Sequence, residues 1–546
     1  MKGPNTLSPF YPLMLALALV AGLFIGKDMG DGSHGGGGFT VFNFRQPSAA
    51  DKIGQVLELI DRQYVDTVQK NALVDEVLQD ILQRLDPHSY YISAAEINAA
   101  QEPLEGSFEG IGVEFAIQRD TIVVITPVEG GPSAAAGIRS GDRILSANGV
   151  PLAGVKVSNE DVMKNLRGPA DSEVKVQVLR SGKKDPFEVL IQRGRIPINS
   201  VAVSLIEDDG TGYIKLIRFA KNTHEEFMQA VTSLQEKGMQ RLVVDLRGNG
   251  GGYLTSAVAL ADEFLDEGDV IVYTEGRNSP RRDITATNDG SLHEIPLAVL
   301  IDEGSASASE IIAGAVQDND RGIVVGRRSF GKGLVQEHME LPDRSAVRLT
   351  TARYYTPSGR SIQRPYGEGI AYGDDLETRF AHGEFVSPDS IKLDTSKIYY
   401  TSRGRTVYGG GGIMPDIFVA ADTAEASRYL TELFFSGAIN DFAFDIADRD
   451  RSGLLGFGSP EEFAQRFQVS EKLLNELNEF AEKQGISPDA GGSERSRDQI
   501  ALRLKAGIAR NLWGNSGYYE IILDEDRIYN RAIEALEDRH LSTIAP

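Results

Sequence analysis

The chain contains no cysteine. This absence excludes a thiol nucleophile, a disulfide framework and thiolate metal ligands, because each of these requires a cysteine sulfur. It does not decide the cellular compartment, since many envelope proteins also lack disulfides. The compartment therefore has to be inferred from the N-terminus.

Positive charge is scarce as well. The chain has 56 Lys plus Arg against 79 Asp plus Glu, which gives a net charge of −23. Such a surface repels phosphate backbones and anionic headgroups, so nucleic acid is not expected as a partner. The hydrophobic share of 41% and the charged share of 25% are those of a globular protein, which excludes wholesale disorder. A length of 546 residues predicts roughly three or four folded units.

An apolar run stands near the N-terminus. It comprises 17 residues, Phe10–Gly26, and lies between Lys2 and the glycine-rich residues 30–38. A buried soluble helix is one interpretation, but the run has no neighbouring element to pack against, so export is favoured. The A-x-A sequence at residues 16–18 lies inside the run rather than after it. We therefore predict an uncleaved signal anchor rather than a cleaved signal peptide.

Patterns along the rest of the chain predict regions of different structure. Apolar positions recur at helical spacing between residues 49 and 84. Alternating strands with glycine turns follow, then strands that alternate with amphipathic helices, and finally charged helical segments. The predicted organisation is a signal anchor (1–26), a Gly-rich linker (27–48), an N-terminal helical region (49–105), a mostly β module (106–197), an α/β core (198–423) and a C-terminal helical region (424–546).

Ser307 is the first candidate nucleophile. It follows the apolar strand 296–301 and a Gly/Ser turn, and a helix is predicted to begin beside it. A strand-turn-helix exposes a hydroxyl next to unpaired amides at the helix N-terminus, of which Ala308 is the first, and such amides can stabilise an oxyanion. The competing interpretation is structural. Ser307 and Glu310 fit the S-x-x-E capping box, so the serine could serve only as a helix cap.

A nucleophilic serine needs a base, and no histidine is evidently placed for this role. His88 and His338 lie nearest to the motifs, but neither belongs to a triad pattern, so both are interpreted as structural. Lys332, between two glycines after the strand GIVVG, is the alternative base. Gln336 follows at an even separation, which places it on the same strand face as Lys332 if the segment is extended. The competing interpretation is an exposed turn lysine and a surface glutamine.

Two glycine-rich segments have features of nucleotide sites, but neither completes its pattern. GRRSFGKG has the spacing of a P-loop, but Gly333 stands where a Ser or Thr must hold magnesium. DLRGNGGG is similar to a dinucleotide-binding turn, but Tyr253 stands where the third glycine is required. A glycine loop at the carboxyl end of a strand can still offer amides to an oxyanion. Gly250 or Gly251 is therefore the candidate second donor.

Eight short motifs follow one another along about 330 residues: LDPHSYYI (85–92), FEGIGVEF (108–115), LRGPADSEV (166–174), DLRGNGGG (245–252), GSASASEI (304–311), FGKGLVQ (330–336), YYTPSGRSIQ (354–363) and GGIMPD (411–416). Together they resemble the carboxyl-terminal processing, or tail-specific, protease family. The family's nucleophile is the middle serine of S-A-S-A-S, which is Ser307, and its lysine lies 25 residues later, at Lys332. The family's glutamine matches Gln336. Asp318 matches a position important for activity, although a structural role at the helix end is an equal interpretation.

The β module resembles a PDZ domain. Its segment Gly110, Ile111, Gly112 and Val113 matches the loop whose amides hold a terminal carboxylate. Arg167 matches a PDZ arginine that in relatives couples tail binding to the protease core, and a solvated surface arginine is the other interpretation. The resemblance therefore implies recognition of the C-terminal tails of protein substrates.

The resemblance implies an α/β, crotonase-like protease core of mixed sheets and helices, with an inserted mostly β PDZ domain and helical regions at both ends. The implied function is a serine endopeptidase of the bacterial envelope, anchored in the inner membrane with the protease on the periplasmic or extracytoplasmic side. A catalytically silent PDZ scaffold and a nucleotide-dependent enzyme are the alternatives.

The expected partners are protein substrates with accessible C-terminal tails. Formation of a homo-oligomer and binding of an adaptor protein are left open. No cofactor or metal is predicted: the segment from Asp448 begins like a calcium loop but has Ser459 where the bidentate Glu is required.

Overall fold

The structure, a computed structural model, describes residues 49–538 except 129, 181, 368–369 and 490. The chain divides into two compact units, Met1–Leu73 and Val74–Pro546. In the first unit the described residues form helix α2 (Ala49–Gln63) and the start of helix α3 (Lys70–Gln83). The helical spacing of apolar residues between 49 and 84 thus corresponds to two helices.

The structure contradicts the predicted single-pass membrane location. Among the described residues 49–538, no helix is both long enough and apolar enough to cross a bilayer. The longest helix in that part, α17 (Arg497–Ile522), has 26 residues but carries several charged side chains, among them Arg503 and Lys505. Charged side chains are costly in hydrocarbon. The apolar run Phe10–Gly26 and the linker 27–48 lie outside the described residues.

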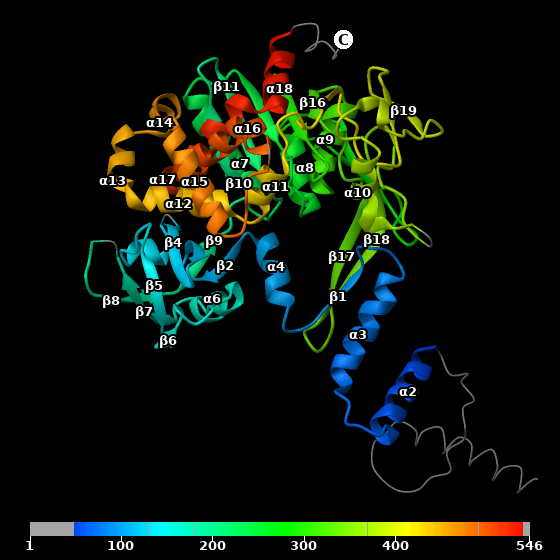
Figure 1. Cartoon of the computed structure of the whole chain (residues 1–546). Helices are drawn as coiled ribbons and strands as arrows, with labels where there is room; N and C mark the ends of the chain where they lie inside the picture. Colours follow the sequence, from blue (N-terminus) through cyan, green and yellow to red (C-terminus); the bar gives the residue numbers. More distant parts are fainter. Residues whose placement is uncertain (1–48, 129, 181, 368–369, 490, 539–546) are drawn as a thin grey trace, which may run out of the picture. The chain divides into compact units, whose positions relative to one another are not determined.

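The α/β core contains a six-stranded sheet of order β10-β11-β12-β15-β16-β21 (Figure 1). The first pair is antiparallel and the other neighbours are parallel. Its central strands are apolar runs that are buried on both faces, as parallel strands usually are. The strands are β10 (Val201–Ile206), β11 (Thr211–Leu216), β12 (Arg241–Asp245), β15 (Leu297–Ile301), β16 (Ile323–Gly326) and β21 (Ile417–Phe418).

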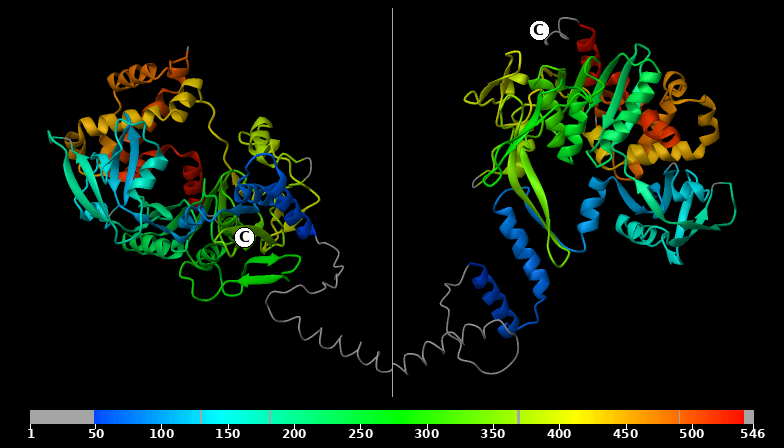
Figure 2. Two further views of the ribbon diagram at one scale, coloured as in Figure 1. Left: turned by 90° about the horizontal axis from the view of Figure 1, so that it is seen from below. Right: turned by 180° about the vertical axis from the view of Figure 1, so that it is seen from behind.

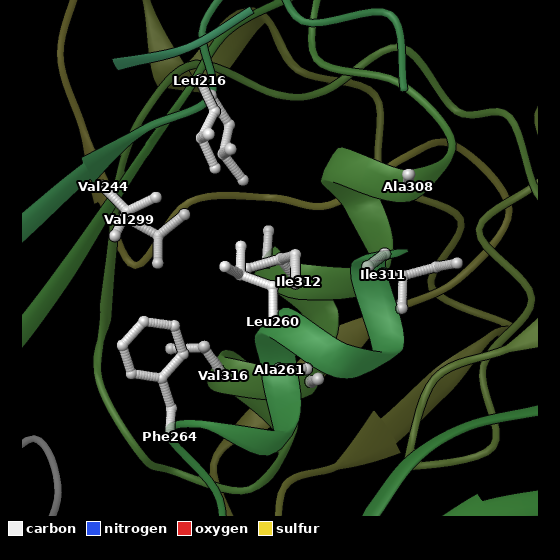
Figure 3. Close-up of a cluster of buried hydrophobic side chains, with 14 of the residues drawn as sticks. Leu216, Val244, Leu260, Ala261, Phe264, Val299, Ala308, Ile311, Ile312 and Val316 are labelled. Carbon is white, nitrogen blue, oxygen red and sulfur yellow. The ribbon is translucent and has the colours of Figure 1, made fainter. Parts of the chain in front are cut away.

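Helices cover both faces of this sheet, because side chains alternate along each strand. On one face Val244 and Val299 belong to a hydrophobic cluster that includes residues of three helices. Figure 3 labels cluster residues from two of these helices, 254–262 and 308–318. On the other face Val243 and Ala298 pack with helix α18, drawn in red beside the green strands (Figures 1 and 2). The helices are α7 (Thr223–Glu236), α8 (Leu254–Asp262), α9 (Ala308–Asp318) and α18 (Arg527–Glu537).

A second, antiparallel sheet has the order β1-β18-β13-β14, and β17 pairs with β18 to form a hairpin. Its strands are β1 (Tyr90–Ile92), β13 (Val270–Glu275), β14 (Arg282–Thr285), β17 (Leu334–Glu340) and β18 (Ala346–Tyr355). The pairing of β17 with β18 shifts between Val335 and Gln336, which marks a β-bulge. Between β18 and β21 lie α10 (Asp375–Ala381) and the hairpin of β19 (Ile398–Tyr400) and β20 (Thr406–Tyr408).

The mostly β module forms a five-stranded sheet of order β3-β4-β5-β7-β8, with β6 paired to β5. Burial alternates along β7, where Val174, Val176 and Val178 face the core, as a half-buried strand requires. The elements are β2 (Ser107–Gly110), β3 (Val113–Gln118), β4 (Thr121–Pro127), α5 (Pro132–Ala135), β5 (Arg143–Ala147), β6 (Val150–Pro151), α6 (Asn159–Leu166), β7 (Glu173–Leu179), β8 (Phe187–Gln192) and β9 (Gly194–Pro197). Helix α4 (Ile97–Glu105) precedes the module, and β2 pairs with β9.

The C-terminal region is helical and has its own hydrophobic core. Helix α15 shows the principle: Leu474, Leu477 and Ala481 recur at helical spacing and are buried, and the Ser470 side chain caps the first turn. The helices are α11 (Arg428–Phe435), α12 (Ala438–Arg449), α13 (Arg451–Leu454), α14 (Pro460–Arg466), α15 (Glu471–Lys483), α16 (Gly492–Arg495) and α17. The segment from Asp448, considered above as a calcium loop, is largely helical.

Candidate active site

Ser307 stands between strand β15 and helix α9. Its φ of 56° and ψ of −111° are uncommon for a residue with a side chain, and such backbone outliers concentrate at functional sites. The carboxylate of Glu310 accepts the Ser307 N–H at 2.8 Å, while the Glu310 amide donates to the Ser307 carbonyl oxygen at 2.9 Å. The first of these contacts is the Glu310 half of the S-x-x-E capping box considered above.

Lys332 lies in the loop between β16 and β17 and is partly buried. Burial, followed by the charge of Arg348, lowers the pKa of its amine below the usual value, while Glu310 and Asp86 act in the opposite direction. A lysine can act as a base only in its neutral form. The loop therefore gives Lys332 an environment that favours the form a base needs.

Glu310 joins the serine and lysine segments. Its buried carboxylate accepts four hydrogen bonds, from the Ser307 amide, the Gly331 amide, the Lys332 amide and the Ser329 hydroxyl. Burial raises the pKa of Glu310 to about 7, although these four hydrogen bonds favour the ionised form. Sequence reasoning noticed Glu310 only as a partner in a capping box. Its contact with the lysine loop could not be inferred from that spacing.

Tyr354 is a second residue that sequence reasoning missed. It belongs to β18 and is buried, and its hydroxyl donates to the carbonyl oxygens of both Ser307 and Lys332. One hydroxyl can satisfy two acceptors only when they lie close together. Tyr354 therefore binds the carbonyl oxygens of Ser307 and Lys332, and Glu310 binds their amides. Together the two side chains connect the two candidate catalytic segments.

The glycine loop after β12 lies against the serine turn. A Cβ built on Gly251 would stand 2.8 Å from Ser307 Cβ and 2.9 Å from the Ala308 nitrogen, so only glycine fits there. The amide of Gly251 donates to Asn249 Oδ1 at 2.9 Å and is therefore already engaged. Gly250 has open space in the direction of a Cβ. Of the two glycines predicted as oxyanion donors, only Gly251 has its amide engaged by another residue in the described part of the chain. Gly250 therefore stays the predicted donor, together with Ala308 at the first position of α9.

Gln336, predicted as a catalytic residue that orients the lysine amine, and Asp318, predicted as a possible supporting residue, occupy different places. Gln336 lies beyond the β-bulge, and its side-chain amide donates to Thr350 Oγ1 at 3.4 Å. Because a bulge changes which face a side chain occupies, the even separation from Lys332 does not by itself fix their relative orientation. Asp318 lies at the far end of α9 and forms a buried ion pair of 2.7 Å with Arg360. Helix α9 has 11 residues, so about 15 Å separates the two helix ends.

His88 lies closer to the site than its sequence context indicated. Its Nε2 is 2.8 Å from the Tyr372 hydroxyl. Burial, followed by the charge of Lys332, lowers the pKa of His88 to about 4, although Asp86 opposes this. His88 is therefore a neutral imidazole near the lysine. His338, by contrast, contacts Gln101 at an exposed position, 3.1 Å away.

The predicted tail-binding loop lies at the open edge of the β module. Strand β3, which starts at Val113, pairs only with β4 among the described strands, so its other edge is available for an added strand. Ile111 is buried and Gly112 has a φ of 71°, which favours glycine. Gly110 ends β2 immediately before this loop. The loop thus combines an open edge with a turn of main-chain amides.

Arg167 is not a free surface arginine. It follows the last residue of α6, and its guanidinium forms a hydrogen-bonded ion pair of 2.5 Å with Glu102 on α4. The same guanidinium lies 4.5 Å from the centre of the Phe108 ring. Arg167 therefore connects the end of α6 to α4 and to the start of the β module.

Comparison with known proteins gives three family matches. Residues 210–372 match Peptidase family S41, and residues 110–191 match the PDZ domain. Residues 429–514 match a family of unknown function. The matches cover the serine and lysine segments and the tail-binding loop.

Individual relatives agree with these matches. The carboxy-terminal-processing protease of Bartonella bacilliformis is 36% identical over 320 residues, which covers 57% of this chain and 72% of the relative. The carboxy-terminal processing protease CtpB of Bacillus subtilis is 35% identical over 319 residues, with shares of 58% and 66%. Among solved structures, the photosystem II D1 C-terminal processing protease has 31% sequence identity, a TM-score of 0.32 and shares of 56% and 88%.

Proposed function

This chain belongs to the carboxyl-terminal processing protease family of serine peptidases, and from that premise we propose that it cleaves peptide bonds with Ser307 as nucleophile and Lys332 as base. The observation that carries this proposal is the Glu310 carboxylate, which binds the backbone amides of both residues. No other pair of a serine and a lysine was indicated by the motifs. The alternative of a catalytically silent PDZ scaffold does not require this arrangement.

The reaction begins with neutral Lys332, which takes the proton of the Ser307 hydroxyl as the serine oxygen bonds to the substrate carbonyl carbon. The carbonyl oxygen becomes an oxyanion, and the amides of Gly250 and Ala308 donate to it. When the tetrahedral intermediate collapses, the C–N bond breaks and the lysine ammonium returns its proton to the leaving amine. Water then attacks the acyl carbon while Lys332 accepts a proton from that water. The bond between the acyl carbon and the Ser307 oxygen breaks, the lysine ammonium returns its proton to this oxygen, and the product leaves as a carboxylic acid that ionises in water.

The decisive experiment compares the purified protein with Ser307→Ala on an unstructured polypeptide substrate. We expect mass spectrometry to show cleavage by the wild type and none above background by the variant, because the variant lacks the nucleophile. Circular dichroism provides the folding control. Equal cleavage by a correctly folded Ser307→Ala protein would exclude this mechanism.

The PDZ module is proposed to select substrates by their C-terminal tails. We expect a reporter polypeptide with a free apolar C-terminus to be cleaved faster than the same chain with an amidated end, because amidation removes the carboxylate that main-chain amides would hold. The measurement is the initial rate for each chain at a concentration below KM. A short peptide that spans the scissile bond but has no tail serves as the control, and its rate should not depend on amidation. Equal rates for the two long chains would reject tail recognition.

A further inference from the structure

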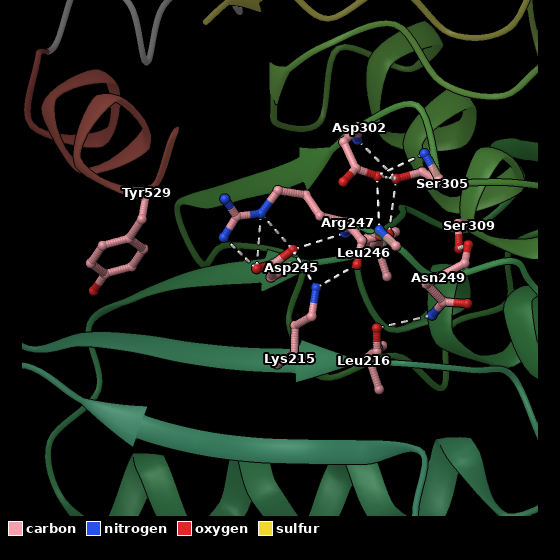
Figure 4. A network of polar contacts seen from close by, with 12 residues as sticks. Lys215, Leu216, Asp245, Leu246, Arg247, Asn249, Asp302, Ser305, Ser309 and Tyr529 are labelled. Atoms are coloured by element: carbon pink, nitrogen blue, oxygen red, sulfur yellow. Dashed lines mark hydrogen bonds and ion pairs between the residues drawn. The ribbon is translucent and has the colours of Figure 1, made fainter. Parts of the chain in front are cut away.

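A buried charge network lies at the end of β12, at the start of the glycine loop (Figure 4). Asp245 is fully buried and accepts hydrogen bonds from the Arg247 guanidinium at 2.6–3.0 Å, the Lys215 amine at 3.0 Å and the Tyr213 hydroxyl at 2.7 Å. Burial alone would raise the pKa of Asp245, but Arg247 and Lys215 outweigh it and hold that pKa below its usual value. The network fixes the first residues of the loop.

The second carboxylate on Arg247 comes from the C-terminal end of the chain. Arg247 Nη1 donates to Asp526 Oδ1 at 2.9 Å, and Arg247 Nη2 lies 2.7 Å from Asp526 Oδ2. This is a two-point contact of the kind that fixes a guanidinium in direction as well as position. The side chains of Arg247 and Asp526 are only 16% and 14% exposed, so solvent screens this pair less than it screens a surface pair.

Asp526 is itself held in place. Its side chain caps α18 by accepting hydrogen bonds from the amides of Ile528 and Tyr529, at 3.0 and 3.1 Å. Ile528, Tyr529 and Ala532 are buried against the core sheet. The packing of α18 against the core sheet therefore fixes the position of the Asp526 carboxylate.

Arg247 leads directly into the candidate oxyanion loop. Its carbonyl oxygen accepts a hydrogen bond from the Lys215 amine. Two residues later, the carbonyl oxygen of Asn249 accepts from the Ala306 amide at 3.0 Å. It also accepts from the Ser309 hydroxyl at 2.8 Å, and Asn249 and Ser309 are labelled in Figure 4. The next residue is Gly250. We therefore expect a displacement of Arg247 to displace the Gly250 amide, which in the proposed mechanism donates to the oxyanion.

We propose that Asp526 is a positioning residue of the active site, which holds Arg247 and thereby sets the position of the Gly250 amide. This inference rests on the proposed Ser-Lys function. It assigns to helix α18 a part in catalysis, although α18 lies outside the residues that match Peptidase family S41. A purely stabilising role is the alternative, and the two differ in the kinetic constant that they affect.

The test is Asp526→Asn, because asparagine is as good a helix cap as aspartate but cannot form the two-point ion pair. We expect kcat to fall by about 10–10²-fold with KM within about twofold, since losing a whole oxyanion donor lowers kcat by about 10²–10³-fold. A peptide aldehyde, which forms a tetrahedral adduct with serine, should lose affinity in parallel with kcat. Active-site titration corrects each rate for the folded fraction. Asp526→Ser, which also caps well, should reproduce the loss.

Asp422→Asn is the matched control. Asp422 Oδ2 lies 3.4 Å from Nη1 of Arg527, the residue that follows Asp526 and begins α18, and both side chains of this pair are exposed. This variant should retain wild-type kcat. A lowered melting temperature in Asp526→Asn with unchanged kcat per titrated site would show a stabilising role only and would overturn the proposal. Retention of activity in Ser307→Ala would instead overturn the proposed function itself, so the two failures can be told apart.

Discussion

Replacing Lys332 by arginine should lower kcat by at least ~10²–10⁴-fold, the usual effect of losing a general base, with little change in substrate affinity. Arginine keeps the charge and the approximate length of the side chain, but its guanidinium stays protonated in proteins and cannot accept the Ser307 proton. Steady-state kinetics on a folded sample provides the measurement, and Lys397→Arg, at an exposed ion pair with Asp394, is the control. Near-normal turnover of Lys332→Arg would refute the Ser-Lys mechanism.

The pH dependence of the wild type tests the same proposal. The pKa of Lys332 is lowered in the folded protein. The neutral fraction of its amine therefore increases at pH values lower than those at which a free lysine titrates. We therefore expect kcat/KM to rise with pH and reach a plateau below the usual lysine pKa of about 10.4. A rate that is independent of pH over this range would argue against lysine as the base.

Replacing Glu310 by glutamine should lower kcat by about 10²–10³-fold, because an amide cannot accept all four hydrogen bonds that fix the Ser307 and Lys332 segments relative to each other. The carboxylate accepts four hydrogen bonds, but an amide offers a single oxygen and turns two of its own N–H groups toward donors. Each buried donor left unsatisfied costs about 1–3 kcal/mol, so stability should fall as well. Both kcat and the melting temperature are measured. Glu303→Gln, in the turn between β15 and α9 and paired with Arg327, serves as the control and should stay active.

Glu310 also predicts opposite pH trends for stability and activity. Its pKa is raised from 4.5 to about 7 on folding, so its stabilising contribution is complete below pH 4.5 and is lost as pH rises through about 7. This displacement corresponds to ~3 kcal/mol. Activity should follow the opposite course, because only the ionised carboxylate can accept all four hydrogen bonds. Denaturant titrations between pH 4.5 and 8 should show this slope in the wild type and lose it in Glu310→Gln.

Local pattern was sufficient for the main elements of the fold. The apolar strand predicted at 296–301 corresponds to the buried strand β15 (Leu297–Ile301), and the alternating strands predicted in the β module 106–197 include β7, whose burial alternates. These elements follow from periodicity, which reports only on neighbouring residues. The single-pass membrane location was wrong, because the apolar run alone was taken as an anchor and no described helix meets that requirement.

The motifs alone indicated the chemical types at the candidate site: a serine at a strand-to-helix turn, a lysine between glycines and a glycine loop after a strand. The contacts that hold these residues in place became visible in the three-dimensional fold. Glu310 contacts a loop 22 residues away, Tyr354 spans both segments, and Asp526 reaches Arg247 across 279 residues. Such contacts depend on which strands and helices become neighbours, and side-chain spacing along the chain carries no record of that. The motifs therefore predict which residue types form the candidate site, whereas packing sets the relative positions of these residues.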